Sequence, residues 1–215
     1  TEANTAAHRL AKATHILLPE SWQGKLKPTH TYPGILPQAY VPQNCDAWGS
    51  AKGQVQIELG IPSEDLVVFH RKITGDGVHD GAEIVNYEST IRKMKVHFVE
   101  NKESAAAMDG SAWEFPVQAT LFDGVITGST TLAAEAVIQG VPTLLISKAK
   151  RGFLTYLSDQ THFFHWNEDD VYDGRFNQMA KAWMECMRSV RITGRSPVID
   201  DTKSRLIELF GKPIA

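Results

Sequence analysis

The sequence predicts an α/β fold built on a doubly wound parallel sheet. The clearest sign lies between Phe122 and Ile146, where a short apolar run is followed by a turn of small residues, an amphipathic stretch, a Gly-Val-Pro stop and a second apolar run. That order is typical of a strand–helix–strand unit, whose parallel strands are buried under helices on both faces. Further apolar runs alternate with helical periodicity along most of the chain, so the same arrangement is expected to repeat.

The first quarter of the chain has a different character. Residues 1–13 predict a helix because Ala, Leu and Lys are frequent, and residues 16–18 predict a short strand that ends at a proline. Four prolines between residues 25 and 44 interrupt regular structure and favour an extended linker. We therefore expect residues 1–53 to form a lead-in of helix, short strand and Pro-rich linker, and residues 54–215 to form the α/β domain.

Strands and helices alternate through the predicted domain. The expected strands are residues 66–70, 96–99, 125–126, 144–146 and 163–164, and the expected helices are residues 80–94, 115–121, 152–157, a long helix from Phe176 and a last one at 206–210. This alternation predicts a Rossmann-like sheet, in which ligands bind outside the carboxyl ends of the strands. The loops that follow the strands are therefore the places to seek a site.

The turn between Ile126 and the central helix is the most informative of these loops. Gly128 permits a close approach of the backbone to a ligand. Ser129, Thr130 and Thr131 place hydroxyl groups beside the N–H groups at the start of the helix, which have no acceptor within it. A helix N-terminus of this kind binds phosphate, because its N–H groups and its dipole both favour an anion.

Glu135 lies one helical turn beyond Thr131, at the flank of the apolar stripe of the helix. Its carboxylate can accept two hydrogen bonds from a ribose diol while the turn holds a diphosphate. The alternative is an acidic residue placed near the helix N-terminus for the sake of the helix dipole, an effect of about 0.3–1 kcal/mol that needs no ligand. The spacing leaves both interpretations open.

The loop after the first domain strand carries cations and glycines. Arg71 and Lys72 are followed by Gly75 and Gly77 shortly before a predicted helix, a composition that suits an anion or a sugar diphosphate. An ordinary solvated loop with basic residues is the alternative. His79 lies in the same loop and is a weak candidate for a catalytic acid or base, since imidazole titrates near neutral pH.

These motifs together resemble the nucleotide-sugar motif in the C-terminal half of GT-B-fold glycosyltransferases. The pattern consists of Gly128-Ser129, Glu135-Ala136 and Gly140-Val141-Pro142. It is also similar to non-hydrolysing UDP-N-acetylglucosamine 2-epimerases, where a Ser-Gly-Gly turn precedes a ribose-binding Glu at this distance; here Thr130 and Thr131 replace two glycines. An uncharacterised GT-B-like family of archaeal and bacterial proteins shows a comparable order of segments, namely residues 16–20, 32–34, 39–40, 67–80 and the Gly128 motif.

The resemblance implies a nucleotide-activated sugar as donor substrate, with no separate cofactor. It assigns the diphosphate to Gly128–Thr131 with Arg71, Lys72, Gly75 and Gly77, and the ribose to Glu135. It makes Lys148 and Arg151, in the loop after the strand at 144–146, candidates for the sugar. The implied chemistry is glycosyl transfer in which a nucleoside diphosphate leaves.

In GT-B proteins the acceptor site and any general base come largely from an N-terminal domain. The resemblance implies that this chain lacks most of that domain. We therefore expect half of a two-domain enzyme that binds its donor but needs the other domain, or a partner subunit, for turnover. A sugar-nucleotide epimerase or hydrolase with the same motif is one alternative. A non-catalytic binding module that docks onto a partner is another.

Composition and charge exclude several other classes of protein. Hydrophobic residues make up 42% and charged residues 22% of the 215 residues, as in globular proteins. A net charge of -3 argues against nucleic acid as a partner. No apolar run approaches the ~20 residues of a transmembrane segment, and the widely spaced Cys45 and Cys186 indicate a reducing compartment, so we expect a cytoplasmic protein. His162 and His165 would face opposite sides of a strand, and we expect no metal site.

Overall fold

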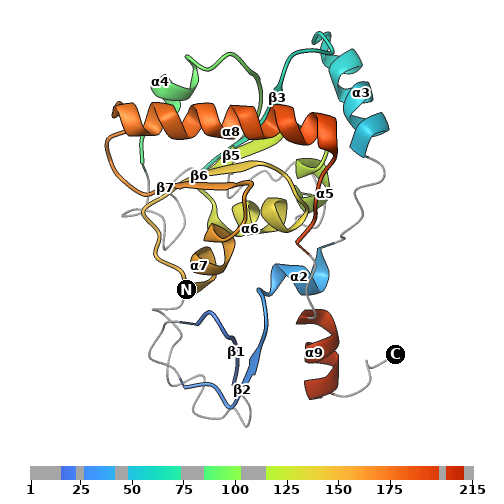
Figure 1. Cartoon of the computed structure of the whole chain (residues 1–215), viewed down its shortest axis with the longest axis vertical. Coiled ribbons are helices and arrows are strands. Elements are labelled where there is room, and N and C mark those ends of the chain that lie inside the picture. The colour runs from blue at the N-terminus through green and yellow to red at the C-terminus, as the bar shows by residue number, and fades with distance from the viewer. Residues whose placement is uncertain are drawn as a thin grey trace.

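The computed structural model describes residues 16–22, 27–41, 48–73, 85–102, 115–198 and 202–210 (Figure 1). The strands are β1 (Leu17–Pro19), β2 (His30–Tyr32), β3 (Val67–Lys72), β4 (His97–Lys102), β5 (Gly124–Thr127), β6 (Thr143–Ile146) and β7 (Phe163–Trp166). The helices are α2 (Pro37–Tyr40), α3 (Trp48–Leu59), α4 (Glu88–Ile91), α5 (Phe115–Ala119), α6 (Thr130–Ile138), α7 (Gly152–Ser158), α8 (Gly174–Thr193) and α9 (Thr202–Phe210).

Five of these strands form one parallel sheet in the order β4-β3-β5-β6-β7. The chain runs outward from β3 to β4, returns to the other side of β3 with β5, and then continues in one direction to β7. This is the doubly wound arrangement, and the direction of winding reverses between β3 and β5. The predicted Rossmann-like α/β fold is confirmed, including all five expected strands.

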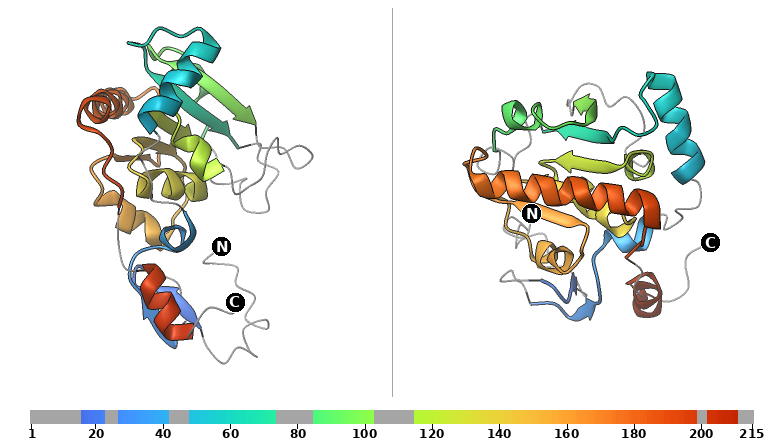
Figure 2. Two further views of the ribbon diagram at one scale, coloured as in Figure 1. Left: turned by 90° about the vertical axis from the view of Figure 1, so that its right-hand side faces the viewer. Right: turned by 45° about the horizontal axis from the view of Figure 1, so that its top comes forward.

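Helices cover both faces of the sheet (Figure 2). The alternation of side chains along each strand sorts the core into two layers. On β5, Val125 packs with α6 and Ile126 packs with α8. The long helix α8 crosses one whole face of the sheet and buries Phe176, Ala180, Trp183 and Met187 against it. The opposite layer is formed mainly by α5, α6 and α7.

The helix α6 ends in a Schellman motif at Gly140. The N–H of Gly140 donates to the carbonyl of Val137 at 2.9 Å, and the N–H of Val141 donates to the carbonyl of Ala136 at 3.1 Å. This motif needs a left-handed residue, and Gly140 has a φ of +74°. A Cβ at this position would lie 2.9 Å from the backbone of Ser196, so the position is crowded as well.

Replacing Gly140 with alanine should therefore lower the free energy of unfolding by about 1–2 kcal/mol from the left-handed backbone alone, with the Ser196 clash adding to it. Gly53 offers the matched control, because it lies inside α3 and a Cβ added there would meet nothing within 4 Å. Gly53→Ala should raise stability by about 0.5–1 kcal/mol. Urea denaturation of both variants checks the opposite signs; equal effects would contradict this interpretation of Gly140.

The segment expected to be an extended linker contains regular structure. Strand β2 pairs in parallel with β1, and the four-residue helix α2 follows it. The proline that was expected to break structure starts the helix instead, since Pro37 occupies its first turn, where a missing N–H costs nothing. The C-terminal helix α9 packs against α2 and β2, and the Thr202 hydroxyl donates to the Pro33 carbonyl at 2.7 Å.

The helix predicted at residues 80–94 is largely wrong within the described residues. Only Glu88–Ile91 are helical. Val85 and Tyr87 are buried while Asn86 between them is exposed, so this stretch follows the two-residue alternation of extended chain and contributes to the core beneath α8. Tertiary burial has thus overridden helical propensity. The helix expected at residues 1–13 lies outside the described residues.

Candidate functional site

A cleft of about 860 Å³ opens at the carboxyl ends of β3, β5 and β6, where the direction of winding reverses. Its lining comes from both parts of the chain, the parallel sheet and the segment of β1, β2 and α2. The lining residues are Leu17, Leu18, Pro19, Trp22, Tyr32, Ile35, Leu36, Pro37, Tyr40, Lys72, Ile73, Val85, Asn86, Tyr87, Glu88, Gly128, Ser129, Thr130, Thr131, Ala134, Ile146, Ser147, Arg151 and Phe153.

The N-terminus of α6 contributes hydroxyl and N–H groups to this lining. Ser129 caps the helix, and its Oγ accepts a hydrogen bond from the Leu132 N–H at 3.4 Å. The buried Thr127 holds the turn in place, since its Oγ1 accepts from the Ser129 N–H at 3.0 Å and donates to the Arg71 carbonyl at 3.2 Å. Thr130 and Thr131 line the cleft, and their N–H groups have no acceptor inside the helix.

Lys72 places an ammonium group in the same cleft, but this group already forms ion pairs with two carboxylates. Its Nζ lies 3.0 Å from Glu88 Oε2 and 3.5 Å from Glu100 Oε2. The hydrogen bond between Lys72 and Glu88 raises the pKa of the lysine and lowers the pKa of that carboxyl. A diphosphate near Lys72 would therefore compete with two carboxylates, which weakens the attraction expected from the sequence.

Glu135 is half-buried on α6 and is hydrogen-bonded to α2. The Tyr40 hydroxyl donates to its Oε1 at 2.7 Å. Burial raises the pKa of Glu135, while the hydrogen bond from Tyr40 and the charge of Arg71 lower it in part. Burial also raises the pKa of Tyr40, and the neighbouring carboxylate raises it further. The Glu135 carboxylate therefore lies where a hydroxyl group can donate a hydrogen bond to it.

Replacing Glu135 with glutamine should raise the free energy of unfolding at pH 7, by about 0.5–2 kcal/mol. The amide keeps an acceptor for Tyr40 but removes the cost of a half-buried charge. Because the folded-state pKa is raised, the native state holds an extra proton between the ordinary carboxyl pKa and the raised one, so wild-type stability falls as pH rises through that interval.

The gain should accordingly vanish below the ordinary carboxyl pKa, near 4.3, where both states are protonated. Thermal unfolding of wild type and Glu135→Gln at pH 4 and pH 7 measures it. Glu185→Gln, which changes an exposed carboxylate on α8, is the matched control. A Glu135→Gln variant less stable than wild type at pH 7 would contradict this explanation.

The other candidate residues of the sequence lie in different surroundings. Arg151 lines the cleft at the start of α7. Lys148 is outside the lining, and its Nζ is paired with Asp169 Oδ1 at 2.8 Å. Arg71 is buried in β3 and acts on Glu135 through its charge. Gly75, Gly77 and His79 lie outside the described residues.

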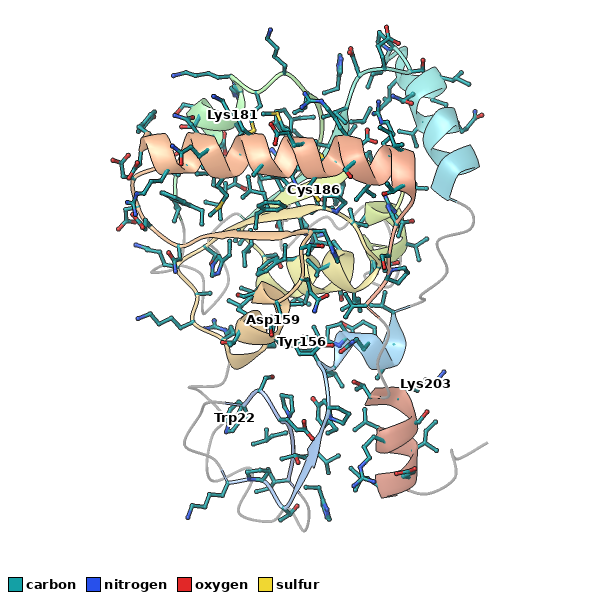
Figure 3. The ribbon with its side chains drawn as sticks, in the orientation of Figure 1. Trp22, Tyr156, Asp159, Lys181, Cys186 and Lys203 are labelled. Atoms are coloured by element: carbon teal, nitrogen blue, oxygen red, sulfur yellow. The ribbon has the colours of Figure 1, made fainter. Side chains whose placement is uncertain are left out.

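The aromatic residues of the cleft have no role in the site expected from the sequence. Trp22, Tyr32 and Tyr40 come from the predicted lead-in, and Tyr87 precedes α4. Trp22 lies next to β1, as Figure 3 shows. The signal that could have found them is the density of aromatic and apolar residues between positions 16 and 41, which exceeds what a solvated linker needs.

A buried histidine stands behind the cleft wall at Tyr87. His70 is fully buried in β3; its Nε2 lies 3.2 Å from the Tyr87 hydroxyl and its Nδ1 lies 3.6 Å from Glu100 Oε1. Burial lowers the pKa of His70, although Glu100 raises it in part.

Two kinds of feature are absent from the described ranges. No three His, Cys, Asp or Glu side chains converge as metal ligands would, and none of the helices has the length and apolar character needed to span a membrane.

No protein-family model matches this sequence, and no curated protein matches it. Among solved structures, two structures of the wall teichoic acid polymerase TagF, one of them soaked with CDPG, are similar at 12% identity and a TM-score of 0.42. The matches cover 80% and 86% of this chain but 49% and 51% of those chains, so the chain spans about half their length.

Proposed function

We propose that this chain binds a nucleotide-activated sugar in the cleft, as the donor-binding half of a glycosyltransferase-type enzyme. One observation carries the proposal: the N-terminus of α6, with its three hydroxylated residues, opens into a cleft at the reversal point of a doubly wound sheet. Ligands of such sheets bind at this place, and a helix N-terminus attracts phosphate. The cleft volume of about 860 Å³ lies within the range of small-molecule sites.

The proposed diphosphate lies against the N–H groups of Thr130 and Thr131 and the hydroxyl groups of Ser129, Thr130 and Thr131. Arg151, which lines the cleft, is the cation we assign to it. Lys72 contributes less, because Glu88 and Glu100 already pair with its ammonium group. During glycosyl transfer the bond from the anomeric carbon to the diphosphate breaks, and these groups would stabilise the negative charge that grows on the leaving oxygen.

The ribose is assigned to Glu135. In the structure a hydroxyl group, that of Tyr40, donates to its carboxylate at 2.7 Å. A ribose hydroxyl would make the same kind of bond, either in place of Tyr40 or to the second oxygen. The acceptor and the general base are assigned to a further domain or partner subunit, so we expect this chain alone to bind its donor without turnover.

Thermal unfolding with UDP-, GDP-, dTDP- and CMP-sugars tests the proposal. A ligand at 100-fold over its dissociation constant should stabilise the chain by ~2.7 kcal/mol, a shift of about 5–10 °C for a chain of this size. Glu135→Ala should remove most of the shift, since it deletes charge-assisted hydrogen bonds. Glu185→Ala, an equivalent change on α8 outside the cleft, should keep it.

The outcomes separate the alternatives. A rise in melting temperature with one nucleotide class, lost in Glu135→Ala, supports donor binding and identifies the nucleobase of the donor. Release of free nucleoside diphosphate without an acceptor would instead favour an epimerase or hydrolase. The absence of any shift, in a chain that unfolds cooperatively, would overturn the proposal and favour a non-catalytic module.

A further inference from the structure

A second hollow lies between α4 and α8, along the flank of α8 beside the residues that face the sheet. We call it the α4–α8 groove; its volume is about 500 Å³. It shares no residue with the lining of the cleft. The groove is lined by Thr90, Lys93, Met94, Lys95, Val171, Tyr172, Asn177, Ala180, Lys181, Met184 and Arg188.

The groove combines an apolar floor with a cationic rim. Met94, Met184, Val171 and Ala180 belong to or pack against the core beneath α8 and form the floor. Methionine side chains adapt readily to different apolar partners. The rim carries four cations, namely Lys93, Lys95, Lys181 and Arg188.

These four cations have no side-chain hydrogen bond or ion pair with any part of the chain that the structure describes. The contrast with the other arginines of α8 is clear, because Arg175 pairs with Glu168 and Asp173, and Arg191 pairs with Asp123. Lys181 and Arg188 lie seven residues apart on one stripe of α8, so they present their charges along the groove. Figure 3 shows Lys181 at the edge of α8 that is nearest to α4.

Nearby carboxylates offset this charge only in part. Asp169 is paired with Lys148, whereas Asp170 accepts from the Tyr172 N–H at 2.8 Å and keeps its negative charge. Glu185 is exposed on α8 and is the one carboxylate of that helix, against the two unpaired cations beside it. In a chain with a net charge of -3, the groove is therefore a local concentration of positive charge.

We propose that the α4–α8 groove docks an acidic segment of a partner protein that also carries apolar side chains. The apolar residues of the segment would fill the methionine-lined floor, and its carboxylates would meet the four rim cations, as in other grooves that hold an amphipathic segment. A flat anionic surface such as a membrane would meet the rim but leave the hollow floor without a partner. The shape of the groove therefore favours a peptide segment.

Selection from a random 12-residue peptide display library tests the proposal. The wild-type chain is the target, and the double variant Lys181→Glu/Arg188→Glu is used for counter-selection. Both side chains are exposed on α8, so the exchange should leave the fold intact. The matched control is Lys27→Glu/Lys203→Glu, which makes the same change in net charge at exposed lysines near β1–β2 and on α9. Circular dichroism and a cooperative melt confirm that each variant is folded.

We expect enriched peptides to carry several acidic and several apolar residues. The best one, synthesised with a fluorophore, should bind with an affinity that falls at least tenfold in Lys181→Glu/Arg188→Glu and changes less than twofold in the control. Its affinity should fall with rising salt and on replacing its Asp and Glu by Asn and Gln. Met184→Gln, which makes the floor polar, should weaken binding as well.

Three results would overturn the proposal. Selection that yields no peptide dependent on Lys181 and Arg188 would remove the docking site. Binding that persists when Met184 is changed, or when the apolar residues of the peptide are replaced by serine, would show a non-specific charge effect. Vesicles containing phosphatidylserine that bind wild type but not Lys181→Glu/Arg188→Glu, in the absence of any such peptide, would assign the groove to a membrane surface.

Discussion

Replacement of Asp123 by alanine should lower the free energy of unfolding by about 3–5 kcal/mol, because it strips a buried charge of its partner. The Asp123 side chain is fully buried just before β5. Its carboxylate accepts from the Val67 N–H at 2.8 Å, from Arg191 Nε at 3.0 Å and from Arg191 Nη2 at 2.6 Å. These bonds join the end of α8 to the amino ends of β3 and β5.

Alanine removes the acceptor of the Val67 N–H and of the Arg191 Nε–H, and it leaves the Arg191 charge without its carboxylate. Val67 is buried, and the Arg191 side chain is only 21% exposed. Arg191 retains bonds to the carbonyls of Ser63, Glu64 and Asp65, so the loop before β3 should remain attached to α8 while the amino ends of β3 and β5 loosen. Urea denaturation followed by circular dichroism measures the loss.

An exposed ion pair supplies the control for Asp123. Glu208 on α9 is 64% exposed and lies 2.7 Å from Arg205. Its replacement by alanine should cost no more than about 1 kcal/mol, as is usual for surface pairs. A loss for Asp123→Ala as small as the loss for Glu208→Ala would mean that the buried pair does not hold α8 to the sheet.

Replacement of Trp183 by alanine is the second large effect, with an expected loss of about 3–5 kcal/mol. Trp183 is fully buried between α8 and the sheet. Its Nε1–H donates to the Pro142 carbonyl at 3.0 Å, which ties the middle of α8 to the start of β6. Alanine removes the largest fully buried side chain of the described core and leaves a cavity beneath α8.

Trp183→Phe separates the packing from the hydrogen bond. Phenylalanine retains most of the apolar volume but cannot donate. The Pro142 carbonyl would not be orphaned, since it also accepts from the Val125 N–H at 2.9 Å. We therefore expect a loss of about 1–2 kcal/mol, well below that of Trp183→Ala. Equal losses in the two variants, measured by urea denaturation, would show that the hydrogen bond and not the packing dominates.

The sequence predicts those elements of the fold whose burial shows as a continuous run of apolar residues. β5, α6 and β6 are buried along most of their length, so the apolar runs and the Gly140 stop appear directly in the sequence. The stretch at residues 85–87 could not be predicted in this way. Its alternation of buried and exposed residues arises from packing beneath α8, an element almost a hundred residues later in the chain.

The candidate site also has a part that the sequence predicts and a part that it does not. The N-terminus of α6 was predictable, because a glycine and three hydroxylated residues between a strand and a helix have a local physical meaning. The contact between Tyr40 and Glu135 joins positions 95 residues apart, and the pairing of Lys72 with Glu88 and Glu100 depends on how β3, β4 and α4 meet. No spacing rule along the chain reports such pairs.

The position of a diphosphate can be measured directly by nuclear magnetic resonance. The chain, labelled with nitrogen-15, is titrated with UDP, GDP, dTDP and CDP, and the backbone amide signals are followed. We predict that the amides of Ser129, Thr130 and Thr131 shift most with one of these nucleotides, and that Glu135→Ala weakens the affinity without moving the affected region. Saturable shifts elsewhere with none at these three amides, or no shifts with any nucleotide, would contradict the proposed site.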